Sequence, residues 1–178
     1  MAYKVLNNVS VKDVTSSDLL SLKTDLLVIV INKNTKDKVV NQLAKDVSSH
    51  LKESGSSVLV PNAKSFNAKN VLLVKGFQDS DQIHKLISMY QSIAQKGNQL
   101  KAKDISIMPG TVYPKGKCEM WLIEMVAKTI ESNVYIFSET CNKTAKKPSV
   151  KKLNILVSSL TKSDLIKAKN AAKKGYAI

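Results

Sequence analysis

The stretch Thr24-Asp-Leu-Leu-Val-Ile-Val-Ile31 decides the fold of this chain of 178 residues. Its last six residues, 26–31, form an unbroken apolar run that is rich in β-branched side chains. Such a run is typical of a strand that other elements cover on both faces, as in a parallel sheet. It is also the longest apolar run of the chain, and it is far too short to span a bilayer. We therefore expect a central buried strand here, in a protein that is not embedded in a membrane.

Strand and helix signals alternate on both sides of this stretch. Further strands are predicted at 3–11, 57–60, 70–74, 104–108, 134–137 and 153–157. Helices are predicted from Thr35 to Gly55, after a capping pair at Asp79 and Gln82, over 117–131, and from Thr161 onward. The polar, lysine-rich segment 138–152 contains a proline and is predicted to be a loop. Repeated strand–helix units with buried strands indicate an α/β sandwich with a mixed, largely parallel sheet, in one domain.

The last stretch, 161–178, begins a helix that has no recognisable end. Thr161 and Asp164 have the spacing of a capping box. Ala168, Ala172 and Gly175 then share one face with the spacing of a helix, and we expect this face to lie close against another backbone. Because no closing signal follows, we expect 161–178 to lead into a further domain, with this face as its packing surface. The alternative is a docked C-terminal helix that frays.

Positive charge is concentrated in the same part of the chain. All 28 basic residues are lysines and the net charge is +14, with ten lysines and one acid between 143 and 178. A cluster of this kind attracts polyanions through salt-sensitive, sequence-independent contacts. The candidate polyanion contacts are Lys143, Lys146, Lys147, Lys151, Lys152, Lys167, Lys173 and Lys174. The absence of arginine argues against sequence-specific recognition of nucleic acid, because arginine is the side chain best suited to contact base edges. The preferred interpretation is that these lysines are simply exposed to solvent.

The histidines and cysteines do not form a catalytic or metal-binding pattern. His50 and His84 are isolated and are interpreted as surface residues. Cys118 is expected to pack as a small apolar residue at the start of a helix, and Cys141 lies among lysines that favour its thiolate form. Neither a redox motif nor a signal-peptide core is present, so a cytoplasmic location is expected.

The carboxylates have structural explanations as well. Asp25 stands where macro domains often carry an aspartate, but the glycine-rich phosphate loops of those domains are missing, and a turn residue before a strand is preferred. Asp79 and Asp81 are explained by helix capping. The glutamates of the 117–131 helix are expected on its solvated side: Glu119, Glu124 and Glu131. We therefore predict no catalytic, cofactor-binding or metal-binding residue in this chain.

The order of the segments resembles the N-terminal domain of the leucine aminopeptidase (cytosol aminopeptidase) family. The resemblance rests on the strand at 24–31, a helix that ends in Leu-Lys-Glu-Ser-Gly55, and the strand Asn70-Val-Leu-Leu-Val-Lys-Gly76 before a capped helix. A Pro-containing turn, two more strands and a helix rich in Lys, Ala and Gly complete the order. Where the family usually has Gly-x-Gly, this chain keeps Gly76 alone. The metal motif Asn-Thr-Asp-Ala-Glu-Gly-Arg of the family's catalytic domain is absent.

The resemblance implies a three-layer, macro-domain-like sandwich at 1–160, followed at 161–178 by the start of a connector helix. It implies a parent metallo-aminopeptidase that removes N-terminal residues from peptides, with two zinc or manganese ions bound in a catalytic domain absent from this chain. The chain itself would be inactive and would help assembly, typically of a homo-hexamer, or limit substrate access. Its partner would be its own catalytic domain. Some bacterial members also bind DNA, which would give the lysine tail a role.

Overall fold

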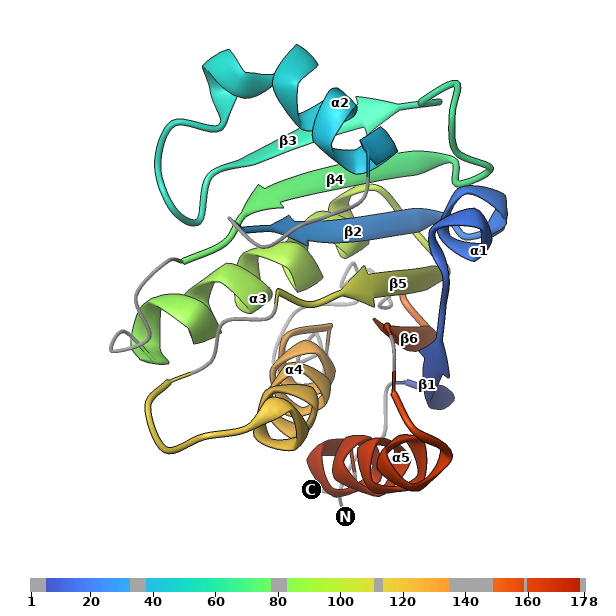
Figure 1. Cartoon of the computed structure of the whole chain (residues 1–178), viewed down its shortest axis with the longest axis vertical. Helices are drawn as coiled ribbons and strands as arrows, with labels where there is room; N and C mark the ends of the chain where they lie inside the picture. The colour runs from blue at the N-terminus through green and yellow to red at the C-terminus, as the bar shows by residue number, and fades with distance from the viewer. Residues whose placement is uncertain are drawn as a thin grey trace, which may run out of the picture.

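A computed structural model describes residues 6–32, 38–77, 83–110, 114–134, 149–158 and 160–176. The strand predicted at 24–31 is β2 (Leu26–Ile31), and its first five residues are buried. It lies inside a six-stranded sheet with the order β1-β6-β5-β2-β4-β3 (Figure 1). The other strands are β1 (Asn8–Asp13), β3 (Ser57–Pro61), β4 (Asn70–Lys75), β5 (Asp104–Met108) and β6 (Lys152–Val157). Among the strands of the described residues, β3 alone runs antiparallel to its neighbour, so the prediction of a mixed, largely parallel sheet is confirmed.

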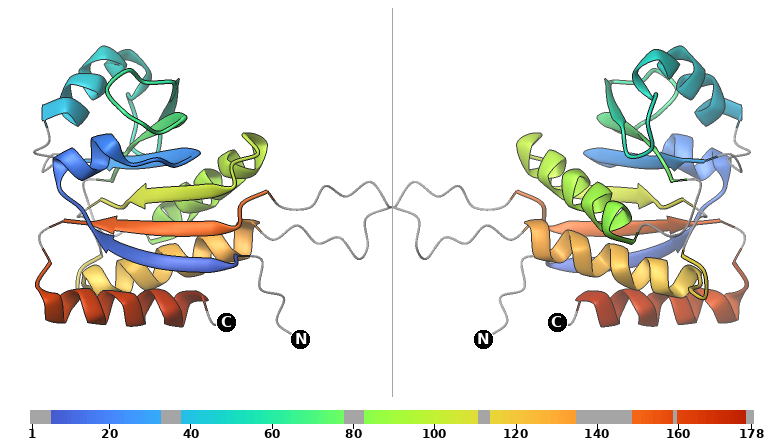
Figure 2. Two further views of the ribbon diagram at one scale, coloured as in Figure 1. Left: turned by 90° about the vertical axis from the view of Figure 1, so that its right-hand side faces the viewer. Right: turned by 90° about the vertical axis from the view of Figure 1, so that its left-hand side faces the viewer.

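Helices cover both faces of the sheet and make a three-layer arrangement (Figure 2). One face packs against α3 (Ile83–Gln99), α4 (Glu119–Val134) and α5 (Lys162–Tyr176). The other packs against α1 (Ser16–Ser21), α2 (Lys38–Asp46) and Leu51, which follows the short 3-10 helix at Ser48–His50. Successive residues of β2 alternate between the apolar clusters on the two faces of the sheet. Val28 faces α3 and α4, and Ile29 faces α2. This alternation explains why the whole run had to be apolar.

The helix that follows β2 is shorter than predicted. Within the described residues it ends at Asp46 instead of continuing to Gly55, and Thr35 lies outside the described residues. Val47 has a non-helical backbone, and Ser48 and Ser49 belong to the residue types that favour caps and turns over helix interiors. Leu51 is still buried, in the apolar cluster between the sheet and helices α1 and α2. Its position in the predicted apolar pattern therefore came from its burial, and not from a continuous helix.

Three features of the N-terminal part and of α4 differ from the prediction. The first strand covers Asn8–Asp13 instead of 3–11, of which 3–5 lie outside the described residues. Helix α1 was not predicted, although Thr15 and Asp18 form a capping box around its first turn. Val134 was expected to begin a strand, but it is the fully buried last residue of α4. The rest of that predicted strand, and the capping pair at 79 and 82, lie outside the described residues.

Two side chains near α4 are placed differently from the sequence expectation. Glu131 was assigned to the solvated side, but it is 9% exposed and its Oε2 accepts a hydrogen bond of 3.2 Å from the backbone amide of Leu6. Cys118 was expected to pack inward, yet it is exposed just before the first turn of α4. Glu131 can be buried because the fold brings the backbone amide of Leu6 next to it, and a carboxylate inside the protein needs a hydrogen-bond donor to offset its burial.

Helix α5 confirms the expectation that its Ala and Gly face lies close to another backbone. Ala168, Ala172 and Gly175 are buried, and the neighbour is α4 (Figure 1). A Cβ atom at position 175 would overlap the carbonyl oxygen of Glu124 and lie 3.0 Å from the backbone nitrogen of Lys128. The packing surface proposed for a missing domain is therefore already occupied within this chain. No helix among the described residues is long and apolar enough to cross a membrane.

Candidate functional site

The carboxyl ends of the parallel strands form one edge of the sheet, where open α/β sheets bind their ligands. The chain leaves β2 toward α2 on one face, and it leaves β5 toward α4 on the other face. Because β2 and β5 are neighbours, their connections separate at this point. This divergence is the topological switch point, the place at which a crevice is expected.

A cleft of about 200 Å³ lies beside this point. Its lining comes from the ends of β5 and β6 and from the first turn of α4, and includes Gly110, Glu119, Leu122 and Ser158. Burial raises the pKa of the Glu119 carboxyl, and the nearby carboxylate of Asp164 adds to this rise. Glu119 is therefore more easily protonated than an ordinary glutamate, and in that form it can donate a hydrogen bond to a ligand.

The strand ends are packed too tightly for larger side chains. A Cβ atom at Gly110 would lie 3.1 Å from Nδ2 of Asn32 and from Cγ1 of Val30, and one at Gly76 would lie 3.0 Å from the carbonyl oxygen of Ile31. Tyr90 of α3 reaches the same place: it is 1% exposed and hydrogen-bonded to the backbone of Gly110. Burial raises the pKa of Tyr90, so its hydroxyl stays neutral. The glycines therefore serve the packing of this edge.

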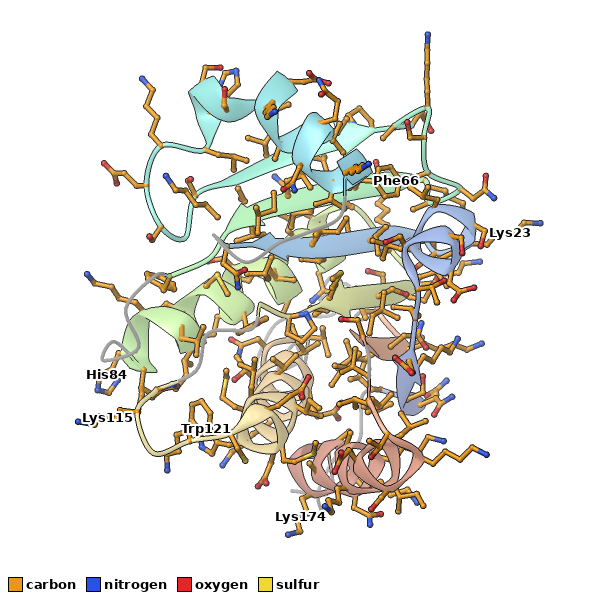
Figure 3. The ribbon with its side chains drawn as sticks, in the orientation of Figure 1. Lys23, Phe66, His84, Lys115, Trp121 and Lys174 are labelled. Atoms are coloured by element: carbon orange, nitrogen blue, oxygen red, sulfur yellow. The ribbon has the colours of Figure 1, made fainter. Side chains whose placement is uncertain are left out.

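The side chains of the described residues that line the cleft offer groups that can bind a ligand. The polar side chains among its lining residues are a carboxyl at Glu119 and a hydroxyl at Ser158. Across the described ranges, no three His, Cys, Asp or Glu side chains come together as a group that could hold a metal ion. His50 and His84 are exposed, as expected, and Figure 3 shows His84 pointing away from the body of the protein.

The predicted polyanion contacts do not all meet on one surface. Lys143, Lys146 and Lys147 lie outside the described residues. Lys152 begins β6, and because the next residue, Leu153, faces the cluster of α3, α4 and α5, Lys152 faces the opposite side of the sheet. Lys151, just before β6, is half-buried, and its amide donates to the carbonyl of Lys103.

The other predicted contacts lie on the solvent side of α5. Lys167, Lys173 and Lys174 are exposed, and Lys174 points away from the sheet in Figure 3. Helical spacing places Lys167 and Lys174 on one flank, seven residues apart. Lys173 lies on the other flank with Lys169 and with Lys162, which was not among the predicted contacts. The described part of the lysine tail therefore forms two rows on one helix.

Asp25 has the structural role that was preferred for it. Its carboxylate accepts a hydrogen bond of 2.8 Å from the backbone amide of Lys103 and forms an ion pair with Lys69. Its carbonyl accepts from Nδ2 of Asn70, and its amide donates to Oδ1 of Asp104. Asp25 thus joins the amino ends of β2, β4 and β5, at the edge of the sheet opposite the cleft.

Asp25 is expected to make stability depend on pH in the acid range. Burial alone would raise the pKa of its carboxyl, but the hydrogen bond from Lys69, the amide of Lys103 and the charge of Lys69 lower it below the ordinary value. A lowered folded-state pKa gives stability that is present above the unfolded value of about 3.9 and is lost as the pH falls below it. In urea titrations between pH 7 and pH 3, Asp25→Asn should be less stable than the parent at pH 7, and the difference should shrink toward pH 3. Parallel curves would contradict this role.

Comparison with known proteins identifies the fold. No protein-family model and no curated protein sequence matches the chain. Among solved structures, a mutant of tomato leucine aminopeptidase matches with a TM-score of 0.63 and 18% sequence identity, over 96% of this chain and 36% of the enzyme. The chain thus spans about a third of the length of that enzyme.

Macrodomains match this chain comparably well. The macro domain of ganglioside induced differentiation associated protein 2 gives a TM-score of 0.62 at 16% identity, over 96% of this chain and 84% of that one. A Trypanosoma brucei macrodomain in complex with ADP-ribose gives 0.56 at 14% identity, over 90% of this chain and 67% of that one. The predicted macro-domain-like fold is confirmed, and at these identities the likeness concerns the fold alone.

Proposed function

We propose that this chain is the non-catalytic N-terminal domain of a leucine-type metallo-aminopeptidase, and that it acts in assembly or in limiting substrate access. The observation that carries the proposal is the coverage of the structural match. Almost the whole chain corresponds to only about a third of the tomato enzyme. The order of motifs around 24–31 and 70–76 supports the same assignment. The two zinc or manganese ions, the peptide substrate and the hexamer belong in this proposal to the parent protein.

A ligand-binding macrodomain is the second candidate. The observation that favours it is the cleft beside the switch point, on a fold also found in a macrodomain solved in complex with ADP-ribose. The glycines of this chain are explained by packing at Gly76 and Gly110, and no glycine-rich phosphate loop accompanies them. For this reason we place it second. The polyanion-binding alternative stays a prediction for the lysine rows of α5.

Residues 1–178 are expected to show no peptidase activity. The purified chain, supplied with manganese or zinc, should not hydrolyse leucine p-nitroanilide above the buffer rate, because no catalytic residue of the aminopeptidase family can be assigned in it. A complete leucine aminopeptidase under the same conditions is the positive control. Metal-dependent hydrolysis that persists through purification would contradict the proposal.

Two further measurements separate the candidates. Sequencing the gene beyond the codon of Ile178 should reveal the metal motif Asn-Thr-Asp-Ala-Glu-Gly-Arg if the chain belongs to an aminopeptidase. Calorimetric titration with ADP-ribose should give no heat of binding in that case. Binding of ADP-ribose, lost when Ser158, an exposed residue of the switch-point cleft, is replaced by tryptophan, would favour the macrodomain candidate instead.

A further inference from the structure

A second and larger cleft, of about 800 Å³, lies on the other half of the sheet edge. It is formed between the turn at 52–55, the end of β4 and the first turns of α3. None of its lining residues is shared with the cleft beside the switch point. Its volume falls within the range of about 300–1,000 Å³ that is usual for small-molecule sites. We call it the lysine cleft, after Lys52, Lys75 and Lys85 in its lining.

One wall of the lysine cleft is held in place by hydrogen bonds. The amide of Gly55 donates to the carbonyl of Lys75 at 2.6 Å, and the amide of Lys75 donates to the carbonyl of Ser56 at 2.9 Å. Within the turn, the hydroxyl of Ser56 donates to the carbonyl of Glu53 at 2.6 Å. Nζ of Lys75 donates to the carbonyl of Lys52, also at 2.6 Å. The turn is therefore fixed to the end of β4 before any ligand arrives.

An aromatic ring forms part of the lining. Phe77 is half-buried, and a Cβ atom at Gly55 would lie only 3.4 Å from Cζ of its ring. Gly55 also has a φ of +87°, a backbone conformation that favours glycine. This residue lets the ring lie directly against the turn. Together with Met89, which is 4% exposed, Phe77 gives the cleft an apolar surface next to its charges.

The charged groups of the lysine cleft favour an anion. Among the described residues that line the cleft, three carry an ammonium group and one, Glu53, carries a carboxylate. The ammonium group of Lys75 keeps two donors after its bond to Lys52, and Lys85 is exposed. The hydroxyls of Ser88 and Ser92 donate to carbonyls of their own helix, at His84 and Ser88. The lysines, together with the hydroxyl of Ser54, are therefore the side-chain donors that the described lining offers to a ligand.

We propose that the lysine cleft binds a small anionic ligand that carries a phosphate group and an aromatic ring, such as a nucleotide. Lys52 and Lys85, from opposite walls, contact the phosphate, with the ammonium of Lys75 between the turn and the strand end. Phe77 contacts the ring, since an aromatic side chain can stack on any base. This site is independent of the proposed aminopeptidase relationship, and it lies apart from the switch point that the macrodomain candidate uses.

Titration of the full chain with adenosine monophosphate, followed by calorimetry and by backbone amide chemical shifts, tests the proposal. We expect saturable binding, with shifts at Gly55, Ser56 and the first turns of α3. Lys85→Gln and Lys52→Gln should each weaken binding about tenfold, the size expected for the loss of one hydrogen bond to a charged group. Lys128→Gln, an exposed lysine of α4 outside this cleft, is the matched control and should leave the affinity unchanged.

Further titrations test separately how the phosphate and the ring of the ligand are bound. Phe77→Leu should weaken the binding of adenosine monophosphate but not that of inorganic phosphate, and adenosine alone should bind much more weakly than the nucleotide. The proposal is overturned if Lys128→Gln loses as much affinity as Lys85→Gln, if the shifts map elsewhere, or if no saturable binding occurs. Circular dichroism of each variant ensures that a loss reflects the site and not unfolding.

Discussion

Replacing Ile105 with alanine is expected to lower the free energy of unfolding by about 2–5 kcal/mol. Ile105 is fully buried in β5, beside Leu26 of β2 and Leu153 of β6. Its side chain also fills the space above Gly97 of α3, where a Cβ atom would lie 2.5 Å from its Cδ1. Truncation would remove apolar contacts with both the sheet and the helix and leave a cavity.

Urea denaturation followed by circular dichroism measures this loss. The control is Ile166→Ala on α5, where the isoleucine is 61% exposed and the change should stay within about 0.5 kcal/mol. If Ile105→Ala and Ile166→Ala were equally mild, β5 would not lie at the centre of the core. Since a typical domain is stable by about 5–15 kcal/mol, the core variant could lose a large share of its stability.

Gly175→Ala is expected to destabilise the protein by about 1–3 kcal/mol, the usual cost of overpacking. Alanine would normally favour a helix over glycine by about 1 kcal/mol, so the expected sign is the opposite of the helix propensity. The reason is that the new Cβ atom would overlap the carbonyl oxygen of Glu124, a backbone atom that moves only if α4 and α5 separate.

Gly97→Ala is a matched control for this prediction. Both glycines are buried in helices and both gain the same propensity, but the obstacle at Gly97 is Cδ1 of Ile105, the end of a side chain that can rotate. Gly97→Ala should therefore cost less than Gly175→Ala in thermal unfolding. Hydrogen exchange should also show α5 opening more readily in Gly175→Ala. An equal or higher stability of Gly175→Ala would mean that α5 is not held so closely.

The strands with strong local signals could be predicted from the sequence. For β2, β4 and β5 the bounds agree within two residues. In β2 and β4 a continuous apolar run has few alternatives to a strand buried on both faces. The capping pattern at Thr161 and Asp164 was also correct: the Asp164 amide donates to Oγ1 of Thr161 at 3.1 Å. The same pattern at Thr15 and Asp18 was missed, since a six-residue helix has too little periodicity to support it.

Features that depend on distant contacts could not be predicted. Glu131 has the local spacing of a charged residue on a helix surface, and its partner Leu6 is 125 residues away in the sequence. The lysine cleft likewise depends on residues that are far apart in the sequence. Lys52, Lys75 and Lys85 come from a turn, a strand end and a helix, and no local motif links them. The density of lysines in the sequence predicted an anion-binding region in the tail, whereas the tertiary fold brings these three lysines together at one cleft.

The pairing of β1 with β6 also affects the order in which the chain folds. The hydroxyl of Ser10 donates to Oδ1 of Asn154, a partner that lies 144 residues later in the sequence. At synthesis rates of about 5–20 residues per second, the ribosome needs roughly 7 to 30 s to make the chain between them. During that time β1 has no strand to join, and β6 must enter between β5 and β1 to complete the sheet. Non-local pairing of this kind slows folding, so we expect the β1–β6 side of the sheet to form last during translation.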